Sequence, residues 1–114
     1  MAVALAESVE PLGFNGYDPN AFKPGASEEA ARKSVADMVA FNRPNAKTHS
    51  GVWRDLAIRK RRTEVDVQIA PIAEIGATHA IACPAVKALV AMIHEIEDGK
   101  RPLSDDNLLE LARA

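Results

Sequence analysis

The residue whose type and position best suit chemistry is Glu64, in the run Thr63-Glu64-Val65-Asp66. At helical spacing it shares a stripe with Gln68 and the apolar residues Pro71 and Ile75, instead of a solvated row of charges. This placement makes Glu64 the first candidate for a functional carboxylate. A plain alternative stays open, because an acidic residue in a first helical turn, with a hydroxyl just before it, also suits a helix start.

A second group that could do chemistry is the cationic run Arg59-Lys60-Arg61-Arg62. It has three interpretations: a solvated helix junction, an anion or phosphate contact, or a tract that pairs with the acids of a partner. Charge runs are usually solvated, which favours the first. The formal net charge of −2 argues against a general nucleic-acid binder.

The remaining reactive side chains are spread out. His49, His79 and His94 fall on separate predicted elements and form no His-x-x-x-His or Cys-His pair, so we expect no metal site. The single cysteine, Cys83, excludes an internal disulfide framework and suits a packing role. A reducing, cytoplasmic setting is therefore expected.

The element that must position Glu64 is a predicted core helix over residues 61–81, kinked by Pro71 in its interior and ending between Gly76 and Ala80. Its apolar residues recur at helical spacing on one face. They are Val65, Ile69, Ile72, Ala73, Gly76 and Ala80.

Before this helix, residues 10–25 hold three prolines and three glycines and predict a structured loop. We expect its aromatic residues Phe14, Tyr17 and Phe22 to pin it to the helices, and its Gly13-x-x-Gly16 to be a turn. Ser27 then predicts an N-cap for a helix to about Asn42. We expect Val35, Met38, Val39 and Phe41 to form its buried side.

Ser50 stands where it could cap the segment 52–58, and capping is its plain interpretation. After the core helix, Ala82-Cys83-Pro84 predicts the start of another helix, ended by Asp98-Gly99. Its seam of Val86, Leu89, Ile93 and Ile96 can pack inside the protein or against a second copy. Ser104-Asp105-Asp106 predicts a last short helix.

Length and composition indicate the fold class. The 114 residues suit a single helical domain, 1–114, with one hydrophobic core. High alanine and 4% aromatic content favour an all-α fold, a compact bundle of about four to five helices. No stretch reaches the roughly 20 apolar residues of a membrane span, and the first residues lack the features of a signal peptide. We expect a soluble protein.

The ordered motifs resemble the C-terminal domain of the ketopantoate reductase (2-dehydropantoate 2-reductase) family. They are Thr63-Glu64-Val65-Asp66, then His79-Ala80-Ile81-Ala82-Cys83-Pro84 and Lys87-Ala88-Leu89, preceded by the Ser- and Asp-containing stretch 47–56. The resemblance covers roughly residues 45–97. It implies an enzyme of pantothenate biosynthesis that uses NADPH to reduce a 2-keto acid. In that family a Rossmann domain binds the nucleotide, and the helical domain forms the substrate side of the cleft.

The resemblance also implies site residues. Glu64 matches the family's active-site glutamate, which helps set the protonation and position of a catalytic lysine, and Ser50 matches its substrate-contacting serine. The family's Rossmann glycines and catalytic lysine have no counterpart here, so we expect the chain to be inactive alone. Ile69-Ala70 and Val86 stand where the family has Asn-Gly and asparagine, which leaves open a different 2-keto acid.

Two hypotheses therefore stand. In the first, the chain is the substrate domain of a ketopantoate reductase-like enzyme, with a Rossmann domain as its partner. In the second, it is a non-enzymatic module that forms a homodimer through the seam of Val86, Leu89, Ile93 and Ile96. The two are compatible, because such reductases often associate through this domain. Anion or RNA binding by Arg59 to Arg62 is a weaker third idea.

Overall fold

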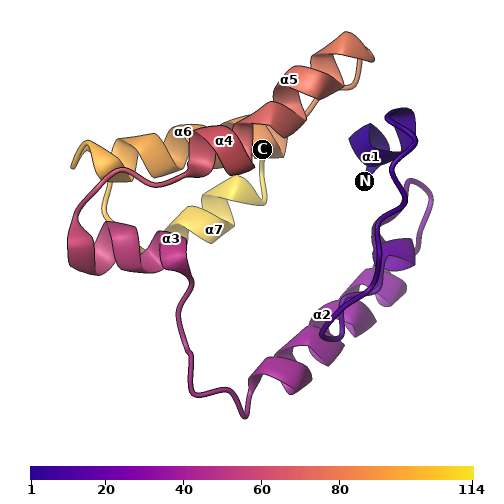
Figure 1. Ribbon diagram of the computed structural model, residues 1–114, viewed down its shortest axis with the longest axis horizontal. Coiled ribbons are helices and arrows are strands. Elements are labelled where there is room, and N and C mark those ends of the chain that lie inside the picture. The colour runs from indigo at the N-terminus through magenta and orange to yellow at the C-terminus, as the bar shows by residue number, and fades with distance from the viewer. The chain divides into compact units, whose positions relative to one another are not determined.

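The computed structural model describes residues 1–114 and confirms the all-α expectation (Figure 1). Its only β pairing is an isolated bridge between Phe14 and Tyr17. None of its helices combines the length and apolar character that crossing a membrane would need. The contacts divide the chain into two compact units, Met1–Thr48 and His49–Ala114, each described by itself below.

Unit 1 contains α1 (Ala2–Ala6), the 3₁₀ turn η1 (Pro19–Phe22) and the long helix α2 (Glu28–Asn42). As predicted, Ser27 caps α2: its Oγ accepts a hydrogen bond from the Ala30 amide at 3.1 Å. The chain between α1 and η1 runs back along α2 (Figure 1).

A tight turn attaches this loop to α2. Asn15 and Gly16 both have positive φ, 50° and 87°, the pattern of a type I′ turn, which confirms turn chemistry at the Gly13-x-x-Gly16 spacing. Ser34, 2% exposed, fastens the turn to the helix, because its Oγ accepts from the Asp18 amide at 2.9 Å and donates to the Gly16 carbonyl. Tyr17 lies between the rings of Phe14 and Phe22, with centroids 5.4 Å away on each side.

The prediction of which side of α2 is buried is wrong. Val35, Val39 and Phe41 are each about half exposed, and Ser34 is the residue of α2 that is buried. The reason is the loop, whose backbone groups need hydrogen-bond partners and therefore lie against the polar Ser34 instead of the apolar stripe.

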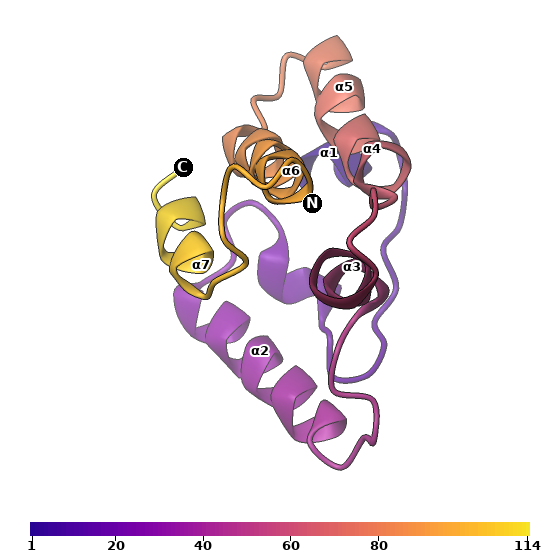
Figure 2. The same ribbon diagram turned by 90° about the vertical axis from the view of Figure 1, so that its left-hand side faces the viewer.

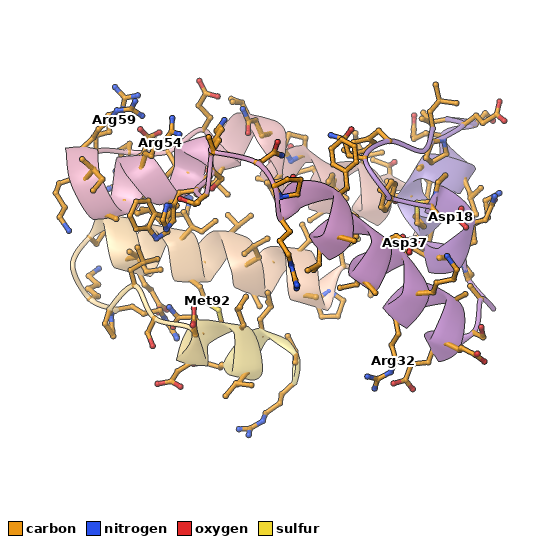
Figure 3. The ribbon with its side chains drawn as sticks, turned by 90° about the horizontal axis from the view of Figure 1, so that it is seen from below. Asp18, Arg32, Asp37, Arg54, Arg59 and Met92 are labelled. Atoms are coloured by element: carbon orange, nitrogen blue, oxygen red, sulfur yellow. The ribbon has the colours of Figure 1, made fainter.

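In unit 2, α6 (Pro84–Glu97) is the longest helix. Figure 2 shows it nearly end-on, with α4 and α5 on one side and α7 on another. The buried apolar side chains of this unit are Leu56, Val65, Met92 and Ile93. Met92 points from α6 toward α7 (Figure 3). The other helical elements are α3 (Gly51–Arg54), η2 (Asp55–Arg59), α4 (Val65–Gln68), α5 (Ala70–Thr78) and α7 (Asp106–Leu111).

The predicted helix over 61–81 is in fact two helices. Residues 61–64 are not helical, α4 ends at Gln68, and Ile69 at φ −115° separates it from α5. The break at Ile69 lies two residues before Pro71, which has no amide to donate to the preceding turn, so the predicted kink takes the form of an interruption. On the expected apolar face, Val65 and Gly76 are buried, but Ile72 and Ala80 are exposed.

Candidate functional site

A pocket of about 430 Å³ at the junction of α3, η2 and α4 brings Ser50 and Glu64 together. These are the two residues that the sequence singled out for a site, and 13 residues lie between them in the chain. Charged and polar side chains dominate the wall, which makes it suited to a small polar ligand. The lining residues are Ser50, Gly51, Val52, Asp55, Arg59, Arg61, Glu64 and Gln68.

Ser50 has the predicted structural role as well as a place in the pocket wall. Its Oγ accepts a hydrogen bond from the Trp53 amide at 3.1 Å and so caps α3. A hydroxyl is both an acceptor and a donor, and capping uses only acceptor capacity. The O–H of Ser50 is therefore chemically able to donate to a ligand oxygen while the cap stays intact.

Glu64 lies at the N-terminal boundary of α4, and its side chain makes no capping hydrogen bond. The carboxylate instead accepts a hydrogen bond from the Gln68 side-chain amide, one helical turn later. The helix start is served by Thr63, whose Oγ1 accepts from the Val65 amide at 3.3 Å. Thus Glu64 is exposed at the pocket wall, with acceptor capacity left for a cation or a ligand.

Asp55 is the buried charge of this pocket. Its Oδ1 accepts from Arg59 Nη1 at 2.9 Å and from Arg61 Nε at 2.8 Å, while its side chain is 12% exposed. The hydrogen bond from Arg59 lowers the pKa of Asp55 below its usual value, burial opposes this, and the hydrogen bond from Arg61 adds to the lowering. Asp55 is therefore a carboxylate shared by two guanidinium groups.

The backbone explains why two arginines reach one carboxylate. Asp55–Arg59 is a π-helical turn, and Lys60 follows in the left-handed conformation at φ 52°, ψ 48°. This reversal lets the Arg61 amide donate to the Asp55 carbonyl at 3.1 Å and brings the Arg61 side chain back to the same acid. π-helical turns are rare and are found often at functional sites.

The cationic run is therefore largely paired within the chain. Arg62 continues the pattern, donating to Glu97 and to Asp98 at 2.8 Å each. Lys60 is the member of the run without an acidic partner. The run is a helix junction whose guanidinium groups bind acids of the same unit. The side chains of its three arginines remain 46% to 67% exposed.

Glu97, at the end of α6, fixes the residues that precede α4 by hydrogen bonds. Its carboxylate is 1% exposed and accepts from the Thr63 amide at 2.8 Å and the Thr63 hydroxyl at 2.7 Å. His94 Nδ1 is 2.7 Å from Glu97, and His94 Nε2 is 2.7 Å from Asp66 in α4. Burial raises the pKa of Glu97, but the hydrogen bonds from Thr63, His94 and Arg62 outweigh it and lower the pKa to about 2.

The other two histidines lie near other elements, α3 and α5. His49 stacks on Trp53 with ring centroids 3.7 Å apart, and His79 follows α5. No group of three or more His, Cys, Asp or Glu side chains in residues 1–114 could hold a metal ion.

Sequence reasoning did not assign Asp55, Arg59 and Arg61 to this pocket, although an anion contact was one interpretation of the cationic run. The Asp55-to-Arg59 spacing of four was a signal for a helical ion pair that could have been used. The approach of Arg61 to the same acid had no such signal, because it depends on the left-handed Lys60. Lysine has no special preference for that conformation.

The family model described as ketopantoate reductase PanE/ApbA C terminal matches residues 2–97, which include α1 and extend to the end of α6. No curated protein and no solved structure matches the chain.

Proposed function

The chain belongs to the ketopantoate reductase C-terminal family, and from this premise we propose that it provides the substrate side of an NADPH-dependent reduction of a 2-keto acid to a 2-hydroxy acid. Residues 1–114 contain no strand and hence no strand-to-helix glycine turn of the kind that binds a dinucleotide. In this proposal NADPH, which supplies the hydride, is bound by a Rossmann domain that acts as the partner of this one.

The observation that carries the proposal is the meeting of Ser50 and Glu64 in one pocket, although they come from different helices. Reduction of a ketone turns its oxygen into an alkoxide, which must be stabilised and protonated. The Ser50 hydroxyl can donate a hydrogen bond to the substrate. The Glu64 carboxylate can orient a cationic proton donor, such as a lysine of the Rossmann domain, beside the same oxygen.

The test joins this chain to the nucleotide-binding domain of a ketopantoate reductase and follows NADPH oxidation with ketopantoate and with smaller 2-keto acids. Replacement of Glu64 by Ala should lower kcat by about 10²-fold or more, because the proton donor loses its orienting charge. The matched control is Glu74→Ala, which removes an exposed acid of α5 outside the pocket and should leave kcat unchanged. Equal rates for the Glu64 and Glu74 variants would remove Glu64 from the mechanism.

The same assay separates the two roles of Ser50. Ser50→Thr keeps both the cap and the hydroxyl, whereas Ser50→Ala loses both. Ser50→Asp keeps an acceptor for the cap but, as a carboxylate, has no donor for the substrate. If Ser50 contacts substrate, KM should rise for the Asp and Ala variants and stay near that of the parent for Thr.

A second candidate function is self-association, with or without catalysis. Its motivation is an apolar groove of about 730 Å³ in unit 2, which includes Leu89, Ile93 and Ile96 of the predicted seam together with Trp53 and Leu108. We propose a homodimer that buries this face. Sedimentation of the chain at micromolar concentration tests the idea, and a strict monomer would leave it without support.

A further inference from the structure

We propose that Arg59 and Arg61, held by Asp55, form the carboxylate-recognition end of the pocket, so that a 2-keto acid binds with its carboxylate on the two guanidinium groups and its oxo group toward Ser50 and Glu64. The inference rests on the proposed function and deepens it. It assigns an orientation to the substrate, and it gives Arg59 and Arg61 the anion contact that was one interpretation of the cationic run.

Both guanidinium groups keep free donors. Arg59 uses Nη1 and Arg61 uses Nε to bind the same oxygen of Asp55. The Nε and Nη2 atoms of Arg59 and both Nη atoms of Arg61 make no hydrogen bond within the chain. Both side chains line the pocket. Planar guanidinium groups with free N–H edges match the two oxygens of a carboxylate.

The charges give the pocket a direction. Two arginines share one aspartate, so that end has a net charge of +1, whereas Glu64 carries −1. A substrate carboxylate is attracted to the arginines and repelled by Glu64. The reverse orientation would place two carboxylates together and leave the guanidinium edges without an anion. The oxo group is therefore the part of the substrate that is left for Ser50 and Glu64.

The arginines are also held in advance of binding. Asp55 is buried in the π-helical turn, and the Arg61 amide donates to its carbonyl at 3.1 Å, so backbone and side chain both fix the reversal at Lys60. A pre-ordered pair loses less conformational freedom when it binds an anion. Asp55 thus acts as a positioning residue for the two guanidinium groups.

The experiment uses the whole 114-residue chain and follows its backbone amide and arginine Nε–H signals by NMR during titration. The probes are 2-oxobutanoate, butanoate, butan-2-one and inorganic phosphate. We expect 2-oxobutanoate and butanoate to shift the signals of Arg59 and Arg61, and butan-2-one to leave them in place. The Ser50 and Gly51 amides should shift with 2-oxobutanoate more than with butanoate, because only the first has an oxo group.

Arg59→Gln and Arg61→Gln should each weaken 2-oxobutanoate binding about tenfold, since a charge-assisted hydrogen bond is worth roughly that factor or more. Each variant leaves Asp55 one arginine, so the buried acid stays paired. The matched control is Arg32→Gln, an exposed arginine of unit 1 that pairs with Glu28 one turn away. It should bind as the parent does.

Two results would overturn the inference. One is an unchanged affinity for 2-oxobutanoate in both Arg59→Gln and Arg61→Gln. If the fused enzyme still oxidises NADPH, this result would reject the proposed substrate orientation and keep the proposed function. The other is a response to phosphate that matches or exceeds that to butanoate, which would assign the arginines to nucleotide phosphate instead. Absence of NADPH oxidation with every 2-keto acid, while butanoate still shifts the arginine signals, would reject the proposed function alone and leave a carboxylate site.

Discussion

At the scale of single residues, the pocket depends on a carboxylate that does not line it. Glu97 accepts hydrogen bonds from Thr63 directly before Glu64, and through His94 it is linked to Asp66 directly after Val65. These bonds attach the start of α4 to the end of α6. The direction in which Glu64 faces is therefore set by residues that have no chemical role in the pocket.

This cluster predicts a stability maximum in mildly acidic solution. The pKa of Glu97 is about 2 in the folded chain and 4.5 ordinarily, so its contribution is present above pH 4.5 and is lost as the pH falls toward 2. Hydrogen bonds to Glu97 and then Asp66 raise the pKa of His94 above 6.5. Its contribution is present below pH 6.5 and is lost as the pH rises through the higher folded value.

Urea unfolding of the chain at a series of pH values measures how its free energy of unfolding depends on pH. The shift in the pKa of Glu97 corresponds to a contribution on the order of 3 kcal/mol to the free energy of unfolding. His94→Gln should flatten the decline on the alkaline side, and Glu97→Gln should flatten the acid side while lowering stability overall. Glu74→Gln, at an exposed acid of α5, is the control and should keep the parent profile. A parent whose stability does not vary between pH 5 and 8 would contradict the role of His94.

At the scale of elements, short irregular pieces do the positioning. The π-helical turn η2 and the left-handed Lys60 orient Arg59 and Arg61, and the interruption at Ile69 separates α4 from α5. In unit 1 the comparable piece is the Asn15-Gly16 turn, which lies directly against α2.

Glycine substitutions test that contact. A Cβ on Gly16 would lie 2.5 Å from the Asp37 carbonyl carbon, and φ is +87°, so Gly16→Ala combines a backbone clash with conformational strain. Gly25→Ala adds strain at φ +85° in open space, which costs about 1 kcal/mol. Gly51→Ala causes neither a clash nor backbone strain and should be neutral or slightly stabilising in α3.

Thermal unfolding should therefore rank the variants Gly51→Ala, Gly25→Ala, Gly16→Ala from most to least stable. Loss of the α2 amide protection in hydrogen exchange should accompany the last of these. If Gly16→Ala and Gly25→Ala are equally stable, the turn does not contact α2 as described.

At the scale of the whole molecule, the chain has two units joined at Thr48 and His49. Residues 41–50 are all exposed, and those after Arg43 contain no helix until α3. Such a connection is a preferred site for a protease. Arg43 precedes Pro44, a bond that trypsin cleaves poorly, which leaves Lys47 as the sensitive position.

Limited trypsin digestion followed by mass spectrometry should give a first cut after Lys47. Arg32 and Lys33 are protected because α2 hydrogen-bonds their backbone. Lys47→Gln should remove the first cut and slow the digestion. Initial cleavage inside α2 or α6 in the parent would contradict the assignment of this segment as the exposed connection.

The sequence by itself determined the features that depend on local chemistry. Serine caps, the prolines that start or interrupt helices and the apolar spacing of α6 act over a few residues, so Ser27, Ser50 and Pro84 predicted boundaries that the structure confirms. Pro71 predicted a kink inside one helix, and the structure has an interruption between two helices there. The family motif likewise singled out Ser50 and Glu64.

Only the tertiary structure decided which charges meet. Arg61 reaches Asp55 through a left-handed residue, and Glu97 reaches Thr63 across 34 positions of the chain, pairings that no spacing rule contains. Burial followed the same logic in α2, where a polar serine is covered because a loop needs its hydrogen bonds. Long-range hydrogen bonds satisfy groups that the chain brings together only after folding, and for that reason their partners could not be predicted from the order of the residues.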